Sequence, residues 1–329
     1  MLNLKAKLSI KLFKKDVEQV AARDGYGKGL IWLGERDPNV VVLTGDLSES
    51  TRSHWFAEKF PKRFIEVGVA ERNMMGIAAG LALSGKIAFV SSYATFNPGR
   101  NWDQFRVSVC YSRGNVKVAG AHAGISVGPD GATHQALEDI AITRVLPGLV
   151  VVVPCDAIEA QKATIAIAQE IKGPAYIRFG REKTPVITTD NTPFKIGQAE
   201  IFRDGSDVAI IGCGMLVYNA LLAAEELKKQ EIQCMVVNNH TIKPIDRETI
   251  TAAAKKCGAV VTVEEHQING GAGSAILEVL AEECPVPAER VGMPDSFGES
   301  GQPFELVEKY GMGKDAIIKA VRKVLSRKR

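Results

Sequence analysis

The chain has 329 residues, of which 46% are hydrophobic and 24% are charged, and its formal net charge is +3. This length suits two domains of about 150 residues each, and the scattered Lys and Arg residues give no support to nucleic-acid binding. No apolar run reaches about 18 residues, and the N-terminal segment MLNLKAKLSIKLFKK lacks the apolar core and cleavage site of a signal peptide. We therefore expect a cytoplasmic protein that neither spans a membrane nor is exported.

The six cysteines are isolated and show neither CxxC pairs nor zinc-site spacing. Most of them lie in apolar runs, so we expect small buried side chains in a reducing compartment. They are Cys110, Cys155, Cys213, Cys234, Cys257 and Cys284.

Residues 16–183 alternate between apolar runs typical of buried strands and segments with helical spacing. Helices are expected over residues 16–36, 102–113 and 156–171. Strands are expected at NVVVLTGD (39–46), FIEV (64–67), IAFVSSY (87–93), NVKVAGAHAG (115–124), LVVVVP (149–154) and AYIRFG (175–180). This alternation predicts a parallel sheet with helices on both faces.

The periodic pattern breaks around residues 184–197, which are rich in Thr, Pro, Asn and Asp. We place a domain boundary there, giving domains 1–190 and 191–329. The second part alternates again, with strands expected at DVAIIGCG, CMVVNNH, AVVTVEEH and RVGMPD. The predicted fold class is α/β, with two parallel-type domains of which the second is smaller.

Residues 64–96 predict a strand, a glycine turn at Gly68, a helix and a second strand that ends in aromatic residues. Glu71 falls in the first turn of this helix, at the sheet edge where open α/β folds bind ligands. A first-turn carboxylate also interacts favourably with the helix dipole. The local pattern alone therefore leaves both a structural and a functional role open for Glu71.

Two polar loops follow predicted strands. The loop after residue 43 contains Asp46, either a ligand contact or a cap for the next helix. The loop at residues 124–135, GISVGPDGATHQ, contains Asp130 and His134, and its glycines and proline predict an irregular backbone. A single histidine in such a loop is more often a surface residue than a functional one.

Two other motifs do not carry chemistry. Gly212-Cys213-Gly214 lacks the third glycine of a dinucleotide-binding turn and fits a tight strand-to-helix connection. Glu264-Glu265-His266 contains metal-binding residue types, but neighbours on a strand point to opposite faces. We therefore interpret this triplet as a strand end or an interface patch.

The segments VGVAERNMMGIAAGLA, SSYATF, GPDGATHQALEDIA and VVPCD, in this order, resemble the transketolase family of thiamine diphosphate enzymes. The resemblance is close over residues 16–180, and residues 197–329 are similar to the C-terminal domain of the family. The family's diphosphate-binding domain carries a Gly-Asp-Gly motif that this sequence does not contain. The resemblance therefore implies the C-terminal subunit of a split transketolase, active only with an N-terminal subunit that holds the diphosphate and Mg²⁺ or another divalent ion. It also implies an α2β2 assembly.

The resemblance also implies roles for individual residues. Glu71 matches the catalytic glutamate that protonates the cofactor's pyrimidine ring, Tyr93 and Phe96 match aromatic residues that pack on this ring, and Asp46 matches a loop aspartate near the cofactor. The family often has a further aromatic residue where this chain has Asn97-Pro98-Gly99, so the outer wall of the pocket is an open question.

Further matches concern a sugar phosphate. The matching phosphate-contact positions are Arg23, Ser50, His122 and Arg181. Asp130 matches a residue that binds a sugar hydroxyl, and His134 matches a catalytic residue beside the substrate carbonyl. The implied reaction moves a two-carbon ketol unit from a ketose phosphate to an aldose phosphate, as in the pentose phosphate pathway.

Three alternatives stay open. A 1-deoxyxylulose-5-phosphate synthase shares the DGxTHQ loop but condenses pyruvate, and the beta chain of a 2-oxo acid dehydrogenase has a similar length. Split transketolases acting on other ketose phosphates or on sulfonates are a variation of the same hypothesis. A non-catalytic scaffold paralogue is the alternative outside enzymology, and the joint presence of Glu71, Asp130, His134 and Arg181 argues against it.

Overall fold

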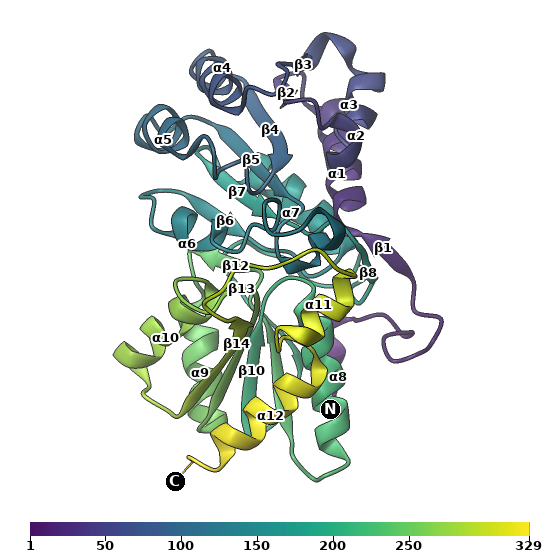
Figure 1. The fold of residues 1–329 in the computed structure, drawn as a ribbon, viewed down its shortest axis with the longest axis vertical. Helices are drawn as coiled ribbons and strands as arrows, with labels where there is room; N and C mark the ends of the chain where they lie inside the picture. Colours follow the sequence, from purple (N-terminus) through teal and green to yellow (C-terminus); the bar gives the residue numbers. More distant parts are fainter. Residues whose placement is uncertain (329) are drawn as a thin grey trace.

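The computed structural model describes residues 1–328 and contains two mostly parallel sheets, each covered by helices (Figure 1). The first sheet has seven strands. They are β2 (Val40–Thr44), β3 (Phe64–Glu66), β4 (Ile87–Tyr93), β5 (Val116–Ala121), β6 (Val150–Val152), β7 (Ala175–Arg178) and β12 (Thr241–Lys243). Their spatial order is β12-β6-β7-β5-β4-β2-β3, and only β12 runs antiparallel to its neighbour. The expected α/β class with parallel-type sheets is confirmed.

Helices cover both faces of this sheet. They are α1 (Ala22–Arg36), α2 (Ser48–Thr51), α3 (His54–Lys59), α4 (Glu71–Leu83), α5 (Trp102–Gln104), α6 (Asp139–Arg144) and α7 (Ala157–Gln169). Helix α1 packs on α7 at very short range. The approach requires glycine at position 25, since a Cβ there would overlap the Ala157 carbonyl oxygen. Short helical turns complete this part of the chain: η1 (Leu4–Ala6), η2 (Pro61–Arg63) and η4 (Ile125–Asp130).

Two predicted helices differ from the structure. The helix expected from residue 16 begins only at Ala22, because Gln19–Ala21 forms β1 and pairs antiparallel with β8 (Lys183–Pro185). The segment expected to be one helix over residues 102–113 continues from α5 as a π-helix, η3 (Phe105–Tyr111). Side-chain periodicity does not separate these two helical forms over so few turns.

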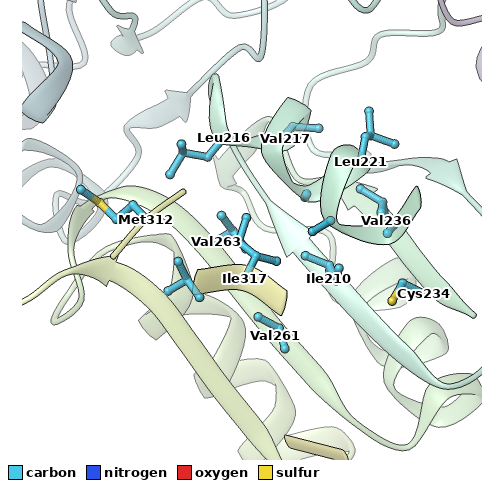
Figure 2. Packing of buried hydrophobic residues seen from close by; sticks show 14 of the residues in the cluster. Ile210, Leu216, Val217, Leu221, Cys234, Val236, Val261, Val263, Met312 and Ile317 are labelled. Atoms are coloured by element: carbon cyan, nitrogen blue, oxygen red, sulfur yellow. The ribbon is translucent and has the colours of Figure 1, made fainter. Parts of the chain in front are cut away.

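The second sheet has the order β14-β13-β10-β11-β9. Its strands are β9 (Glu200–Arg203), β10 (Val208–Gly212), β11 (Cys234–Asn238), β13 (Val260–Gln267) and β14 (Ala288–Met293), and its helices are α8 (Leu216–Lys228), α9 (Arg247–Cys257), α10 (Ala272–Glu283), α11 (Pro303–Lys309) and α12 (Lys314–Leu325). Figure 2 shows Ile210, Val236 and Val261 of this sheet packing beneath α8 and α12. Each fully buried side chain of this size contributes about 1.5–3 kcal/mol of transfer free energy.

The two sheets share parts of the chain. Strand β12 belongs to the second half of the sequence but completes the edge of the first sheet. In the opposite direction, Leu2 forms a β-bridge with Arg203, and Leu12 is buried in the core of the second sheet. The division at residue 190 stays a prediction. In both of these places a segment from one side of residue 190 packs with the sheet of the other side.

All six cysteines lie within the described residues and are free thiols, buried except for the partly exposed Cys284. No helix within residues 1–328 is long and apolar enough to cross a bilayer.

Candidate active site

Glu71 is the first residue of α4 and lies at the edge formed by the carboxyl ends of β2, β4 and β5. Its side chain is only 1% exposed. Oε2 accepts a hydrogen bond from Arg100 Nη1 at 3.0 Å, whereas Oε1 is buried without a partner among the described residues. Because an unpaired buried oxygen costs about 1–3 kcal/mol, this atom is a ready acceptor for a ligand group.

A chain of buried amides holds the start of α4 in place. Asn101 Nδ2 donates to the Glu71 carbonyl at 3.1 Å and to Asn97 Oδ1 at 3.0 Å. Asn97 Nδ2 in turn donates to the carbonyls of Val90 on β4 and Ala119 on β5. Both asparagines are fully buried, so Asn97 is an internal strut and does not form the outer wall of the pocket.

Arg100 lies beside the Phe96 ring, next to the predicted pocket. Its guanidinium lies 4.5 Å from the centroid of the Phe96 ring while it pairs with Glu71. The sequence interpretation missed Arg100, because its contacts with Glu71 and Phe96 are formed only in the tertiary structure. Arg100 joins the carboxylate and the aromatic wall into one unit.

Four rings meet next to Glu71, at the end of β4. Tyr93 stacks on His122 with a centroid distance of 4.0 Å, and Phe96 lies nearly parallel to Tyr93 at 6.1 Å. His134, from the loop at residues 124–135, meets Phe96 edge to face at 5.4 Å. The structure therefore brings the predicted cofactor wall and the predicted catalytic histidine into contact.

Three arginines, Arg23, Arg52 and Arg181, lie near enough to His122 for their charges to lower its pKa. Arg23 Nη1 donates to the Ser50 carbonyl at 3.0 Å, and the Tyr93 hydroxyl donates to Ser50 Oγ at 3.2 Å. Arg181 Nη1 pairs with Asp130 at 3.2 Å. Burial, followed by the charge of Arg52, lowers the pKa of Arg23. All four predicted phosphate-contact residues thus lie in one connected cluster, to which Arg52 is a further addition that sequence reasoning missed.

His122 is held neutral at this site. Burial lowers its pKa to about 2, and the positive charges of Arg23 and Arg181 act in the same direction. Its Nδ1 is buried without a partner within residues 1–328, and its backbone has a φ of 53°. A neutral ring between two arginines offers a hydrogen bond to an anionic ligand without adding charge.

Asp46 is a predicted site residue whose side chain is not shown to contact the other site residues within residues 1–328. It follows β2 at the same sheet edge but is exposed, and its backbone N–H donates to Glu66 Oε1 at 2.8 Å. Its expected contact with a cofactor stays a prediction.

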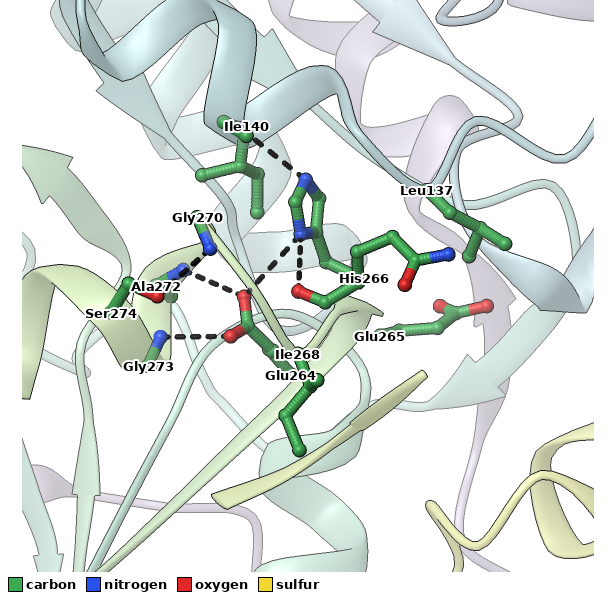
Figure 3. A network of polar contacts seen from close by, with 12 residues as sticks. Leu137, Ile140, Glu264, Glu265, His266, Ile268, Gly270, Ala272, Gly273 and Ser274 are labelled. Carbon is green, nitrogen blue, oxygen red and sulfur yellow. Dashed lines mark hydrogen bonds and ion pairs between the residues drawn. The ribbon is translucent and has the colours of Figure 1, made fainter. Parts of the chain in front are cut away.

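No group of three or more His, Cys, Asp or Glu side chains within residues 1–328 is placed to hold a metal ion. Figure 3 shows why Glu264, Glu265 and His266 do not form one. Glu264 accepts hydrogen bonds from the backbone N–H groups of Ala272 and Gly273 at 2.6 and 2.8 Å. Glu265 lies on the other side of the strand and accepts from the Ser126 N–H. Glu265 thus diverges from its neighbours as predicted, whereas Glu264 and His266 lie on the same face, with 3.9 Å between Glu264 Oε2 and His266 Nδ1.

Comparison with known proteins identifies the family of both domains. A model of the transketolase pyrimidine-binding domain matches residues 18–186, and a model of the transketolase C-terminal domain matches residues 197–317. A solved structure described as a split gene transketolase, inactive beta4 tetramer, aligns with a TM-score of 0.88 and 46% identity, covering 94% of this chain and 100% of that chain.

Three curated relatives are similar along nearly their whole length. A putative transketolase C-terminal section of Methanocaldococcus jannaschii is 46% identical, with 91% of this chain and 94% of the relative covered. The 6-deoxy-6-sulfo-D-fructose transketolase subunit of Clostridium sp. (strain MSTE9) is 42% identical, with 96% and 98% covered. An apulose-4-phosphate transketolase subunit of Phocaeicola vulgatus is 38% identical, with 91% and 96% covered. The chain therefore belongs to the transketolase family, of which it carries the pyrimidine-binding and C-terminal domains.

Proposed function

We propose that the chain is the C-terminal subunit of a thiamine diphosphate-dependent transketolase that moves a two-carbon ketol unit from a ketose phosphate to an aldose phosphate. The observation that carries the proposal is the buried Oε1 of Glu71, which has no partner within residues 1–328 and lies beside the Tyr93–Phe96 wall and the arginine cluster. A structural cap at the start of α4 would not need a free buried oxygen.

The residues fit the pyrimidine half of the cofactor. Glu71 Oε1 would hydrogen-bond a ring nitrogen, and Tyr93 and Phe96 would stack on the ring, an interaction worth about 0.5–1.5 kcal/mol beyond burial. Asp46 is the further contact that we propose at this edge. When bound, the cofactor supplies a carbon nucleophile that takes up the ketol unit. The diphosphate and a divalent ion, Mg²⁺ or another, are assigned to the partner subunit.

The sugar phosphate would bind in the arginine cluster. Arg23 and Arg181 supply the charge-assisted donors that phosphate recognition requires, and neutral His122 and Ser50 supply further hydrogen bonds. Asp130 accepts a hydrogen bond from Arg181 in this structure and would accept one from a sugar hydroxyl in the complex. His134 touches both the aromatic wall and Thr133 Oγ1 at 2.9 Å, so it is placed to move a proton at the substrate oxygens.

The partner would dock on the outer face of α4. A Cβ placed at Gly76 or Gly80 meets no atom within 4 Å, and the nearby Val69 and Leu83 are 68% and 71% exposed. This uncovered face begins one turn from Glu71, where the second half of the cofactor site has to arrive. We propose the separate diphosphate-binding subunit as its occupant, in an α2β2 assembly.

The preferred sugar is a separate question. A sulfonate carries an anionic end group like a phosphate, and the same arginines would bind it. Because one similar relative is named for 6-deoxy-6-sulfo-D-fructose and another for apulose 4-phosphate, both compounds are reasonable donors to test beside xylulose 5-phosphate.

The test is reconstitution. The chain is purified together with a chain of similar size that carries a Gly-Asp-Gly motif, and the complex is assayed with xylulose 5-phosphate and ribose 5-phosphate, then with each alternative donor. Ketol transfer that requires both chains and added cofactor is expected. Consumption of pyruvate without ketol transfer would overturn the proposal in favour of a synthase, and inactivity towards every donor would favour a scaffold role.

A further inference from the structure

The loop at residues 124–135, here called the substrate loop, belongs to the first domain but is held by the second. Its base is closed by its own chain, since the Gly124 N–H donates to the Ala136 carbonyl at 2.8 Å. Arg181 of the first domain also binds it, donating to the Val127 carbonyl and to Asp130 at 3.2 Å. The anchors from the second domain come from β13 and from the segment at residues 298–303, here called the bracing segment. Asp130 and His134 lie on this loop, so their positions depend on these anchors.

Glu265, at the end of β13, makes the first anchor. Its carboxylate accepts the Ser126 N–H at 2.6 Å, and the side chain is only 5% exposed. The contact is close, because a Cβ at Gly124 would overlap the carboxyl group of Glu265, and Gly124 has a φ of 92° that favours glycine. Arg178 donates to the Glu265 carbonyl at 2.7 Å and pairs with Asp139, which fixes the end of the strand from below.

The bracing segment makes the second anchor. Gln135 Nε2 donates to the Glu299 carbonyl at 2.8 Å, and the Gly301 N–H donates to the Gly128 carbonyl at 3.4 Å. A Cβ at Gly131 would lie 2.6 Å from Ser300 Oγ, so the two segments meet almost backbone to backbone. Such packing leaves the loop little room to shift.

We propose that Glu265 is a positioning residue, through which the C-terminal domain holds the substrate loop so that Asp130 and His134 stand at the sugar-binding site. Among residues 1–328, no hydrogen bond or ion pair joins Glu265 to the aromatic wall or to the arginine cluster, and its carboxylate binds the substrate loop through the Ser126 N–H. The kinetic part of this inference rests on the proposed function, whereas the anchoring of the loop does not.

The chain contains a matched control for Glu265. Glu264 is its neighbour on β13, is 2% exposed, and also binds backbone N–H groups, but those belong to the first turn of α10. Glu264→Ala therefore removes an equally buried carboxylate without touching the loop. Glu265→Gln is the conservative variant, since its amide oxygen can still accept the Ser126 N–H.

Two measurements test the inference. Hydrogen exchange of the full chain, followed by mass spectrometry, reports the opening of peptides covering residues 124–135. Steady-state kinetics of the reconstituted complex report KM and kcat for the sugar phosphates. For Glu265→Ala we expect about tenfold faster exchange in the loop, the factor that corresponds to losing one buried hydrogen bond, and a similar rise in KM with a smaller change in kcat. Glu264→Ala should change neither, and Glu265→Gln should restore both.

Each other outcome overturns part of the inference. Unchanged loop exchange in Glu265→Ala would show that Glu265 does not hold the loop, and equal effects in Glu264→Ala would reduce its role to general stability. Faster exchange with an unchanged KM would show that the anchor does not matter for the substrate. If Glu265→Ala does not fold, Gln135→Met removes the second anchor from the other side and gives the same readouts. If the wild-type complex transfers no ketol unit, the proposed function fails, while exchange still decides the anchoring.

Discussion

The two sheets present the same kind of edge, the carboxyl ends of parallel strands, but they use it differently. At the first edge, Glu71 keeps one buried oxygen unpaired, and His122 keeps one buried nitrogen unpaired among residues 1–328. At the second edge, Glu264 fills the start of α10 with both oxygens, and Glu265 reaches across to the other domain. The glutamates therefore differ, since Glu71 leaves a buried oxygen for a ligand whereas Glu264 and Glu265 are bound within the chain, although the second edge also holds unpaired buried atoms of Asn238, Asn239 and His240 among residues 1–328.

The largest expected difference concerns the two buried glutamates. Glu71→Gln should lower kcat of the reconstituted complex about 100-fold or more, because the amide cannot exchange the proton that the cofactor needs. Thermal unfolding and sedimentation of the variant should stay close to those of the wild type. Glu264→Gln is the control, and a comparable loss of kcat there would remove the distinction between the two edges.

A smaller effect is expected from the arginine cluster. Arg181→Ala should raise KM for phosphorylated sugars about 10- to 100-fold, because charge-assisted hydrogen bonds to the anion are lost. KM for unphosphorylated acceptors should change little. The exposed Arg106 lies outside the cluster, so Arg106→Ala serves as the charge-matched control. Equal losses with both types of acceptor would contradict a phosphate role.

A substitution at the edge of the second sheet should change the stability of the chain and leave the turnover of the complex unchanged. Glu264→Ala leaves the N–H groups of Ala272 and Gly273 without their acceptor, and we expect the free energy of unfolding to fall by about 1–3 kcal/mol. Denaturant unfolding measures this loss. A stability equal to that of the wild type would show that the carboxylate does not cap α10 in solution.

The two edges should also differ in the sign of their pH dependence. The pKa of His122 is lowered to about 2, so between that value and its ordinary value of 6.5 the unfolded chain binds more protons and the free energy of unfolding falls as the pH drops. The contribution is at most about 1.4 kcal/mol per pH unit. Burial raises the pKa of Glu265, so its contribution is lost as the pH rises.

Denaturant unfolding between pH 7 and pH 5 measures this difference. His122→Asn, which does not titrate, should reduce the loss of unfolding free energy as the pH falls. Glu265→Gln should instead reduce the loss of unfolding free energy as the pH rises. The same slope in His122→Asn and in the wild type would show that His122 does not stay neutral in the folded chain.

The smallest effect is expected at the glycines. Gly76→Ala adds a methyl group in open space on α4 and should stabilise the isolated chain by about 0.5–1 kcal/mol. Gly271→Ala should destabilise it, because its Cβ would overlap Glu264 Oε2. If the partner covers α4, the bulkier Gly76→Leu should weaken assembly in sedimentation experiments, and unchanged assembly would argue against this docking face.

Long, regular patterns made most of the fold predictable. The run IAFVSSY coincides with β4, and the glycine turn before Glu71 places this residue at the start of α4. Strands of three residues, such as β1 and β12, are too short to show a period, and their pairing depends on distant parts of the chain. Tyr93, His122 and His134 could be named from motifs, but their stacking could not. Arg100 was missed because its contacts with Glu71 and Phe96 depend on tertiary structure.

Strand β12 has a consequence for how the protein is made. The first sheet is complete only after residue 243 has left the ribosome, although its other strands end at residue 178. Until then the outer edge of β6 presents unpaired backbone groups, which are a template for association with other chains. A nascent chain therefore exposes an unpaired, aggregation-prone strand edge at β6 until β12 is made. Protection by a chaperone should matter most in the interval between the synthesis of β7 and that of β12.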